Sequence, residues 1–159
     1  MFSAPRVWWT FRLFGAENVF ILNGGFPRWK AEQRPIEVGP AKHPPRRFEA
    51  RKPADIVASL DAVRAALDSK SAQVVDARPA DRFVGAAPEP RAGVRSGHMP
   101  GALNVPSTAV VDNGSLASPE KLRAAFAAGG VDLDRPVITS CGSGAVSYTH
   151  LTLPTNREV

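Results

Sequence analysis

The spacing of apolar residues predicts a helix over residues 4–14, at the start of the chain. Its apolar face carries Val7, Trp8, Phe11 and Phe14. A short apolar run over residues 19–22, closed by two glycines, predicts a buried strand. Residues 26–33 are expected to form a second short helix before Pro35. The order helix, strand, helix is typical of the end of an α/β unit.

A proline-rich, basic segment over residues 37–53 interrupts this pattern, and its composition predicts a semi-extended linker. Helix and strand patterns then alternate again, with a long Pro-, Gly- and Arg-rich loop over residues 79–101. The predicted elements are a helix capped by Ser59, a strand over 73–76, a short strand over 102–105, a helix from Ser118 to Gly129 and a strand over 136–139. This alternation predicts a parallel α/β sheet.

Composition narrows the class of protein. Of the 159 residues, 43% are apolar and 22% charged, which is typical of a globular protein. No apolar run approaches the ~20 residues that span a bilayer, and the first residues lack the pattern of a secretory signal, so we expect no membrane association. The net charge of +5 comes without a dense basic stripe, which argues against nucleic acid and leaves small anions as partners. A single cysteine fits a reducing compartment, and we expect the cytoplasm.

The only cysteine, Cys141, lies in the stretch T-S-C-G-S-G-A-V, directly after a predicted parallel strand. Open α/β sheets bind ligands at the carboxyl ends of their strands. Gly142 and Gly144 permit backbone conformations that turn several N–H groups toward one anion, and such a loop favours thiolate over thiol. The alternative interpretation is a small buried cysteine followed by an ordinary strand-to-helix turn. These residues alone leave both interpretations open.

Three longer stretches carry a resemblance to a known family. They are RVWWTFRLFGAENVFILNGGFPRW, VVDARPADRFVGAAPEPRAGVRSGHMPGALNVP and SPEKLRAAFAAGGVDLDRPVITSCGSG. In this order and spacing they resemble the tandem rhodanese-like sulfurtransferases of the mercaptopyruvate type. The resemblance implies a rhodanese-like parallel sheet flanked by helices. It also implies the end of a first domain over residues 1–37, a linker over 38–52, an incomplete second, catalytic domain over 53–146, and a tail over 147–159 that is unlike the family.

The family chemistry implies that Cys141 takes a sulfur atom from 3-mercaptopyruvate, which leaves pyruvate and an enzyme persulfide. The outer sulfur then passes to a thiol such as thioredoxin, or to cyanide. No metal or other cofactor is required. A cysteine suits this task because its sulfur is both a good nucleophile and a good leaving group for sulfur.

The resemblance also assigns roles to other residues. Arg82 and Arg91 match arginines that hold the donor's carboxylate and carbonyl, and a guanidinium fork suits a carboxylate. The loop amides at Gly142 and Gly144 would stabilise anionic sulfur. Ser143 matches a serine that relays protons with a histidine and an aspartate of a preceding domain, which none of the three histidines here matches. From the residues alone, solvated arginines and a small turn residue remain alternatives.

We expect His98 to order its loop, Asp76 and Arg78 to form a structural ion pair, and Trp8 and Trp9 to pack between domains or in a core. Two departures from the family stand out. Ala145 and Val146 replace a Val-Thr pair, which leaves the later part of the anion-binding loop open. The tail then predicts a poor helix because of Thr149, Thr152, Pro154 and Asn156.

Three alternatives compete with a mercaptopyruvate sulfurtransferase. A thiosulfate sulfurtransferase is the nearest, although its loop commonly carries basic residues after the cysteine and this loop is uncharged. A cysteine phosphatase would need an arginine about six residues after the cysteine, where Ser147 stands. The third is a catalytically inactive fragment that acts as a thiol-bearing or interaction module.

Overall fold

The centre of the molecule is a three-stranded parallel sheet in the order β2-β1-β5. The structure is a computed structural model that describes residues 3–51, 56–143 and 146–151. Strand β1 (Gln73–Asp76) pairs with β2 (Leu103–Asn104) on one side and β5 (Val137–Ser140) on the other. Every residue of β1 is buried, as expected for an apolar run in the middle of a parallel sheet. The three predicted strands of this unit and their parallel arrangement are confirmed.

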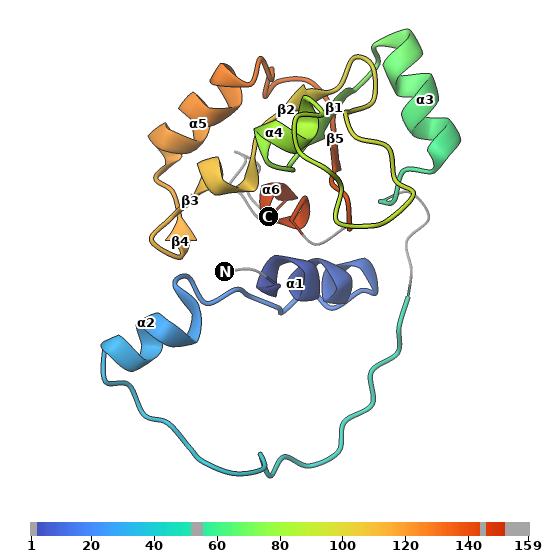
Figure 1. Ribbon diagram of the computed structural model, residues 1–159. Helices are drawn as coiled ribbons and strands as arrows, with labels where there is room; N and C mark the ends of the chain where they lie inside the picture. The colour runs from blue at the N-terminus through green and yellow to red at the C-terminus, as the bar shows by residue number, and fades with distance from the viewer. Residues whose placement is uncertain (1–2, 52–55, 144–145, 152–159) are drawn as a thin grey trace.

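Helices α3 (Leu60–Ser69) and α5 (Pro119–Ala128) lie on opposite sides of the three strands (Figure 1). Both begin where the sequence predicted. The Ser59 hydroxyl accepts a hydrogen bond from the Ala62 amide at 3.1 Å, and the Ser118 hydroxyl accepts one from the Lys121 amide at 3.4 Å. These serine caps satisfy amides that have no partner within the helix, and so fix each helix start.

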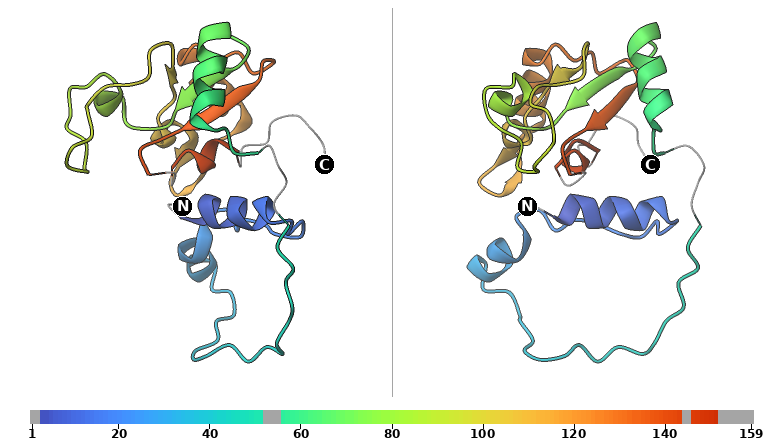
Figure 2. Two further views of the ribbon diagram at one scale, coloured as in Figure 1. Left: turned by 90° about the vertical axis from the view of Figure 1, so that its right-hand side faces the viewer. Right: turned by 45° about the vertical axis from the view of Figure 1, so that its right-hand side comes forward.

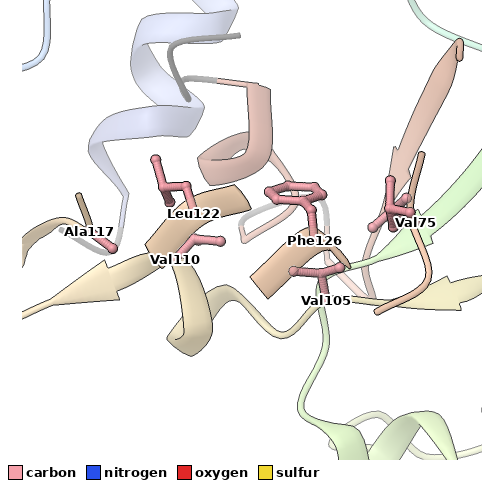
Figure 3. Close-up of a cluster of buried hydrophobic side chains, with 7 residues drawn as sticks. Val75, Val105, Val110, Ala117, Leu122 and Phe126 are labelled. Carbon is pink, nitrogen blue, oxygen red and sulfur yellow. The ribbon is translucent and has the colours of Figure 1, made fainter. Parts of the chain in front are cut away.

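The hydrophobic core lies between α5 and the sheet (Figure 3). It comprises Val75, Val105, Val110, Ala117, Leu122, Phe126 and Val131. Gly129 allows the end of α5 to approach β2 closely, since a Cβ there would lie 2.7 Å from the Asn104 carbonyl oxygen and 2.7 Å from Val105 Cγ2. Only a residue without a side chain fits this approach.

The remaining elements of this unit are short. Helix α4 (Ala80–Phe83) opens the long loop that the sequence predicted between β1 and β2. The 3-10 helix η1 (Ser107–Val110) leads into a hairpin of β3 (Val111–Asp112) and β4 (Ser115–Leu116). The tail was predicted to be a poor helix, yet Tyr148–Leu151 forms one helical turn, α6. Residues 152–159 lie outside the described residues.

The N-terminal segment packs against the outside of this unit through α1 (Ala4–Leu13). Trp9 stacks on Tyr148 of α6 with ring centroids 4.6 Å apart, in agreement with the expected packing role. Figure 2 shows α1 below the sheet domain in both views. The Asn23 side-chain oxygen also accepts a hydrogen bond from the Leu116 amide of β4 at 3.0 Å, which ties the segment to the hairpin.

The predicted strand over residues 19–22 is wrong. Helix α2 (Gly25–Ala31) forms as expected, but the four residues before it pair with no strand among the described residues. Phe20 is 86% exposed, and the Val19 carbonyl instead accepts a hydrogen bond from Trp8 Nε1 at 2.8 Å. An apolar run becomes a strand only where a neighbouring strand satisfies its backbone groups.

Residues 34–51 run as a long exposed stretch without helix or strand (Figure 1). The limits proposed for the two domains, the linker and the tail stay predictions. In the part of the chain that the structure describes, no helix is long and apolar enough to cross a membrane.

Candidate active site

Cys141 follows β5 directly, at the carboxyl edge of the sheet. Asp76, the last residue of β1, pairs with Ser140, the last residue of β5, so both strands end at the same level. The thiol is half-buried and forms no disulfide. The placement predicted from the sequence, at the end of a parallel strand, is therefore confirmed.

The surroundings of Cys141 favour its thiolate. Burial alone would raise the pKa of the thiol. The Ser147 hydroxyl and the backbone amides of Ser147, Val146 and Ser143 donate hydrogen bonds to the sulfur, and together they lower the pKa below its ordinary value. Hydrogen bonds to the charged form always act in this direction. A larger fraction of Cys141 is therefore in the thiolate form than for an ordinary thiol at the same pH.

Of the residues that donate hydrogen bonds to the Cys141 sulfur, the sequence did not predict Ser147 and left the contribution of Val146 undecided. Ser147 is buried and supplies both a hydroxyl and an amide, although the sequence offered only the absence of a phosphatase arginine at that position. The later part of the loop, questioned because Val146 departs from the family, does donate to the sulfur. Gly144, predicted to line the same loop, lies outside the described residues.

The thiol faces a large cavity of about 1110 Å³. The predicted site residues Arg82, Arg91, Gly142 and Ser143 all line it, together with Cys141. Three separate segments thus meet here: the end of β5, helix α4 and the loop that follows α4. The structure brings the sequence-predicted residues together around one space.

Four charged side chains form a chain of ion pairs along one wall of the cavity. Arg78 binds the Asp76 carboxylate through Nε and Nη2, the latter at 2.6 Å, so the predicted structural ion pair is confirmed. Arg78 Nη1 also donates to Glu89 Oε1 at 2.9 Å. Arg82 donates to the same carboxylate from Nε at 3.1 Å and from Nη2 at 2.5 Å. Glu89 therefore joins two arginines.

Glu89 was not singled out from the sequence, although it belongs to the quoted E-P-R element. Its side chain is only 5% exposed. The hydrogen bond from Arg82, followed by the charges of both arginines, holds the pKa of Glu89 below its usual range against the opposing effect of burial. A carboxylate in an arginine-rich loop was the signal that could have found it.

Gly142 does not adopt the glycine-specific backbone conformation that the sequence suggested. Its φ does not lie in the left-handed region, so the residue is not needed for an unusual backbone conformation. A Cβ at this position would instead lie 2.9 Å from Arg82 Nη2 and 3.7 Å from Glu89 Oε2. A side chain at position 142 would thus collide with the Arg82–Glu89 pair, which packs directly against the residue that follows Cys141.

The other predicted residues differ in how firmly they are held. Arg91 is exposed and has no ion pair among the described residues, unlike Arg82. Ser143 is exposed, and its backbone amide rather than its hydroxyl reaches the sulfur. His98 places Nδ1 2.7 Å from the Phe83 carbonyl and stacks on the Phe83 ring, in agreement with its expected role in ordering the loop. Across the described ranges, no group of three or more His, Cys, Asp or Glu could hold a metal ion.

Comparison with known proteins agrees with this geometry. Residues 59–156 match the rhodanese-like domain family. The chain is 44% identical over 147 residues to 3-mercaptopyruvate sulfurtransferase of Escherichia coli K12, covering 92% of this chain and 52% of the relative. It is 42% identical over 154 residues to thiosulfate sulfurtransferase of Bos taurus, covering 96% of this chain and 52% of the relative. The chain therefore spans about half the length of these relatives.

Solved structures give the same picture. The crystal structure of the 3-mercaptopyruvate sulfotransferase SseA from Escherichia coli superposes with a TM-score of 0.83 at 41% identity, over 94% of this chain and 56% of that one. The Tum1 protein of Saccharomyces cerevisiae gives a TM-score of 0.82 at 26% identity, over 95% of this chain and 56% of that one. The fold expected from the sequence, a rhodanese-like parallel sheet flanked by helices, is confirmed.

Proposed function

This chain belongs to the rhodanese-like domain family, and from that premise we propose that it is a sulfurtransferase whose carrier is Cys141. The observation that carries the proposal is the juxtaposition at the cavity: a thiol with a lowered pKa beside arginines that can hold an anionic donor. The relatives named above support sulfur transfer as the reaction class.

We propose 3-mercaptopyruvate as the donor. The Cys141 thiolate attacks the donor's sulfur, and a sulfur–sulfur bond forms as the carbon–sulfur bond breaks. The electron pair of the broken bond leaves on the enolate of pyruvate, which takes up a proton to give pyruvate. The products are pyruvate and a persulfide on Cys141, and the loop amides that held the thiolate remain in place to hold the anionic persulfide.

In the second half-reaction an acceptor nucleophile attacks the outer sulfur of the persulfide. The sulfur–sulfur bond breaks and Cys141 leaves as the thiolate, ready for another cycle. We propose a thiol such as that of thioredoxin, or cyanide, as the acceptor. A lowered thiol pKa helps this step, because a more stable thiolate is a better leaving group.

We propose that Arg82 and Arg91 bind the donor's carboxylate and carbonyl, and that Ser143 assists proton transfer through its exposed hydroxyl. Both arginines line the cavity that contains the sulfur. Gly142 and Gly144 belong to the loop that holds the anion. The chain is proposed to act without a metal or other cofactor, and its single thiol fits the reducing cytoplasm.

Intact-mass measurement tests the proposal. After exposure to 3-mercaptopyruvate, the chain should gain the mass of one sulfur atom and release an equal amount of pyruvate. Cys141→Ser should gain none, and a gain in that variant would overturn the assignment. A chain that folds yet acquires no sulfur from any donor would instead be an inactive, thiol-bearing module.

Thiosulfate is the second candidate donor, favoured by the 42% identity to the Bos taurus enzyme. The loop after Cys141 offers no basic side chain to a second negative charge at Gly142 or Ser143, which favours the monocarboxylate donor. Persulfide formation with thiosulfate in place of 3-mercaptopyruvate, at equal concentration, separates the two donors directly.

A further inference from the structure

We propose that Glu89 is a positioning residue that orients Arg82 for carboxylate binding beside Cys141. This inference rests on the proposed function, because it takes Arg82 as a residue that binds the donor's carboxylate. The hydrogen bonds of the Glu89 side chain run to Arg78 and Arg82. It acts through the arginine that it holds.

The first step of the argument is the way in which Glu89 uses the Arg82 guanidinium. Its two oxygens accept from Nε and Nη2, which lie on one edge of the planar group. A guanidinium carries five N–H donors, so a second edge, formed by Nη1 and the remaining Nη2 hydrogen, is left. Within the described residues no other side-chain hydrogen bond of Arg82 is found. Glu89 thus occupies one edge and leaves free the other, which matches a carboxylate bidentately.

The second step is the position of this pair relative to the nucleophile. Arg82 Nη2 packs against Gly142, which follows Cys141 directly. The Arg82 side chain is 22% exposed and lines the cavity, whereas Glu89 is almost fully covered. Arg82 therefore lies in the wall of the cavity, next to the residue that follows Cys141, and its free edge is the part of the guanidinium available to a carboxylate there.

The third step concerns what holds Glu89. Its Oε1 also accepts from Arg78 Nη1, and Arg78 is itself anchored to Asp76 at the end of the buried strand β1. The sheet thus fixes Arg78, Arg78 fixes Glu89, and Glu89 fixes Arg82. An arginine held in this way loses little conformational entropy when the donor binds.

A simple counter-charge role predicts the opposite behaviour. If Glu89 only neutralised positive charge, its removal would strengthen the attraction of the cavity for anions. If Glu89 positions Arg82, its removal weakens carboxylate binding, because the guanidinium can then turn away from the sulfur. The two roles therefore differ in the sign of the effect.

The experiment uses Cys141, the only thiol of the full chain, as its own reporter. The rate of alkylation by iodoacetate, which carries a carboxylate, is divided by the rate for neutral iodoacetamide. Both reagents react with the same thiolate, so changes in thiol reactivity cancel and the ratio measures carboxylate recognition beside the sulfur. No sulfur transfer is involved, so failure of the proposed reaction and failure of this inference give different results.

We expect Glu89→Gln and Glu89→Asp each to lower the ratio by about 5- to 10-fold, on the scale of one ordinary hydrogen bond, because Arg82 is misplaced rather than removed. Gln keeps the size, but it loses the charge and places an NH₂ donor where Glu89 Oε2 accepts from Arg82 Nη2. Asp keeps the charge but is too short to reach both arginines. In an Arg82→Ala background, neither change should lower the ratio further. The matched control is Glu32→Gln, because Glu32 also joins two arginines, Arg28 and Arg34, outside the cavity.

An unchanged or raised ratio in the Glu89 variants would overturn the inference. So would a further drop in the Arg82→Ala background, since Glu89 would then act independently of Arg82. If Glu89→Gln fails to fold by thermal melting, Glu89→Asp decides on the same criterion. The inference would also be refuted if Arg82→Ala left the ratio at its wild-type value, because Arg82 would then bind no carboxylate.

Discussion

Replacing Gly142 with alanine is the most direct test of how tightly the loop after Cys141 packs against the Arg82–Glu89 pair. The new Cβ would lie 2.9 Å from Arg82 Nη2, whereas ordinary contact begins near 3.4 Å, so the guanidinium must retreat by about 0.5 Å. It cannot do so freely, because Nη2 and Nε are both bonded to Glu89. The methyl group therefore displaces the Arg82–Glu89 pair or distorts the loop.

The expected cost follows from that displacement. Since a misplacement of about 1 Å can reduce a rate by about 100-fold, a shift of half that size predicts roughly a 10-fold loss. We expect Gly142→Ala to lower the iodoacetate-to-iodoacetamide ratio at Cys141 by about this factor, and to slow persulfide formation from 3-mercaptopyruvate similarly. Overpacking of this kind also predicts a loss of about 1–3 kcal/mol of stability, measurable by denaturant unfolding.

The control for Gly142→Ala is the same change in an Arg82→Ala background. Removal of the guanidinium removes the clash, so the second substitution should have little additional effect on the ratio. If Gly142→Ala leaves the ratio unchanged in the wild-type background, the close approach of Arg82 to Gly142 does not affect carboxylate recognition. If the loss persists in full without Arg82, the cause is the loop backbone and the reasoning is refuted.

Four further predictions follow from single contacts. Ser147→Ala should shift the pH midpoint of iodoacetamide alkylation upward, toward the ordinary value of a free thiol, because a hydrogen bond that stabilises the thiolate is lost; an unchanged midpoint would exclude the hydroxyl. Arg91→Ala should weaken use of 3-mercaptopyruvate by less than Arg82→Ala does, since its exposed side chain is not held in place; steady-state kinetics that rank them in reverse would contradict this. Gly129→Ala should destabilise the fold by about 1–3 kcal/mol in denaturant unfolding, because its Cβ would meet the Asn104 backbone, and an unaltered midpoint would refute the close approach. Ser118→Ala should cost about 1 kcal/mol through loss of the helix cap, whereas Ser118→Asp should retain most of the stability.

Much of the fold could be predicted from the sequence because its determinants are local. The apolar run at Val74 and Val75 predicted a buried strand, and Ser59 and Ser118 predicted helix starts through bonds to amides three residues away. The parallel alternation then placed Cys141 at a strand end. The prediction over residues 19–22 failed because strand formation depends on a partner elsewhere in the chain, and apolar character alone does not supply one.

The tertiary structure decided how the site works. The sequence placed Arg82 and Gly142 in one candidate site, but only the fold shows that the guanidinium packs against the glycine, and that Glu89 holds it there. Ser147 likewise became visible only once the chain turned back over the sulfur. Periodicity and capping depend on neighbours along the chain, so a sequence displays them. The orientation of a buried ion pair depends on residues brought together from different elements, and it is fixed only when the whole domain closes around it.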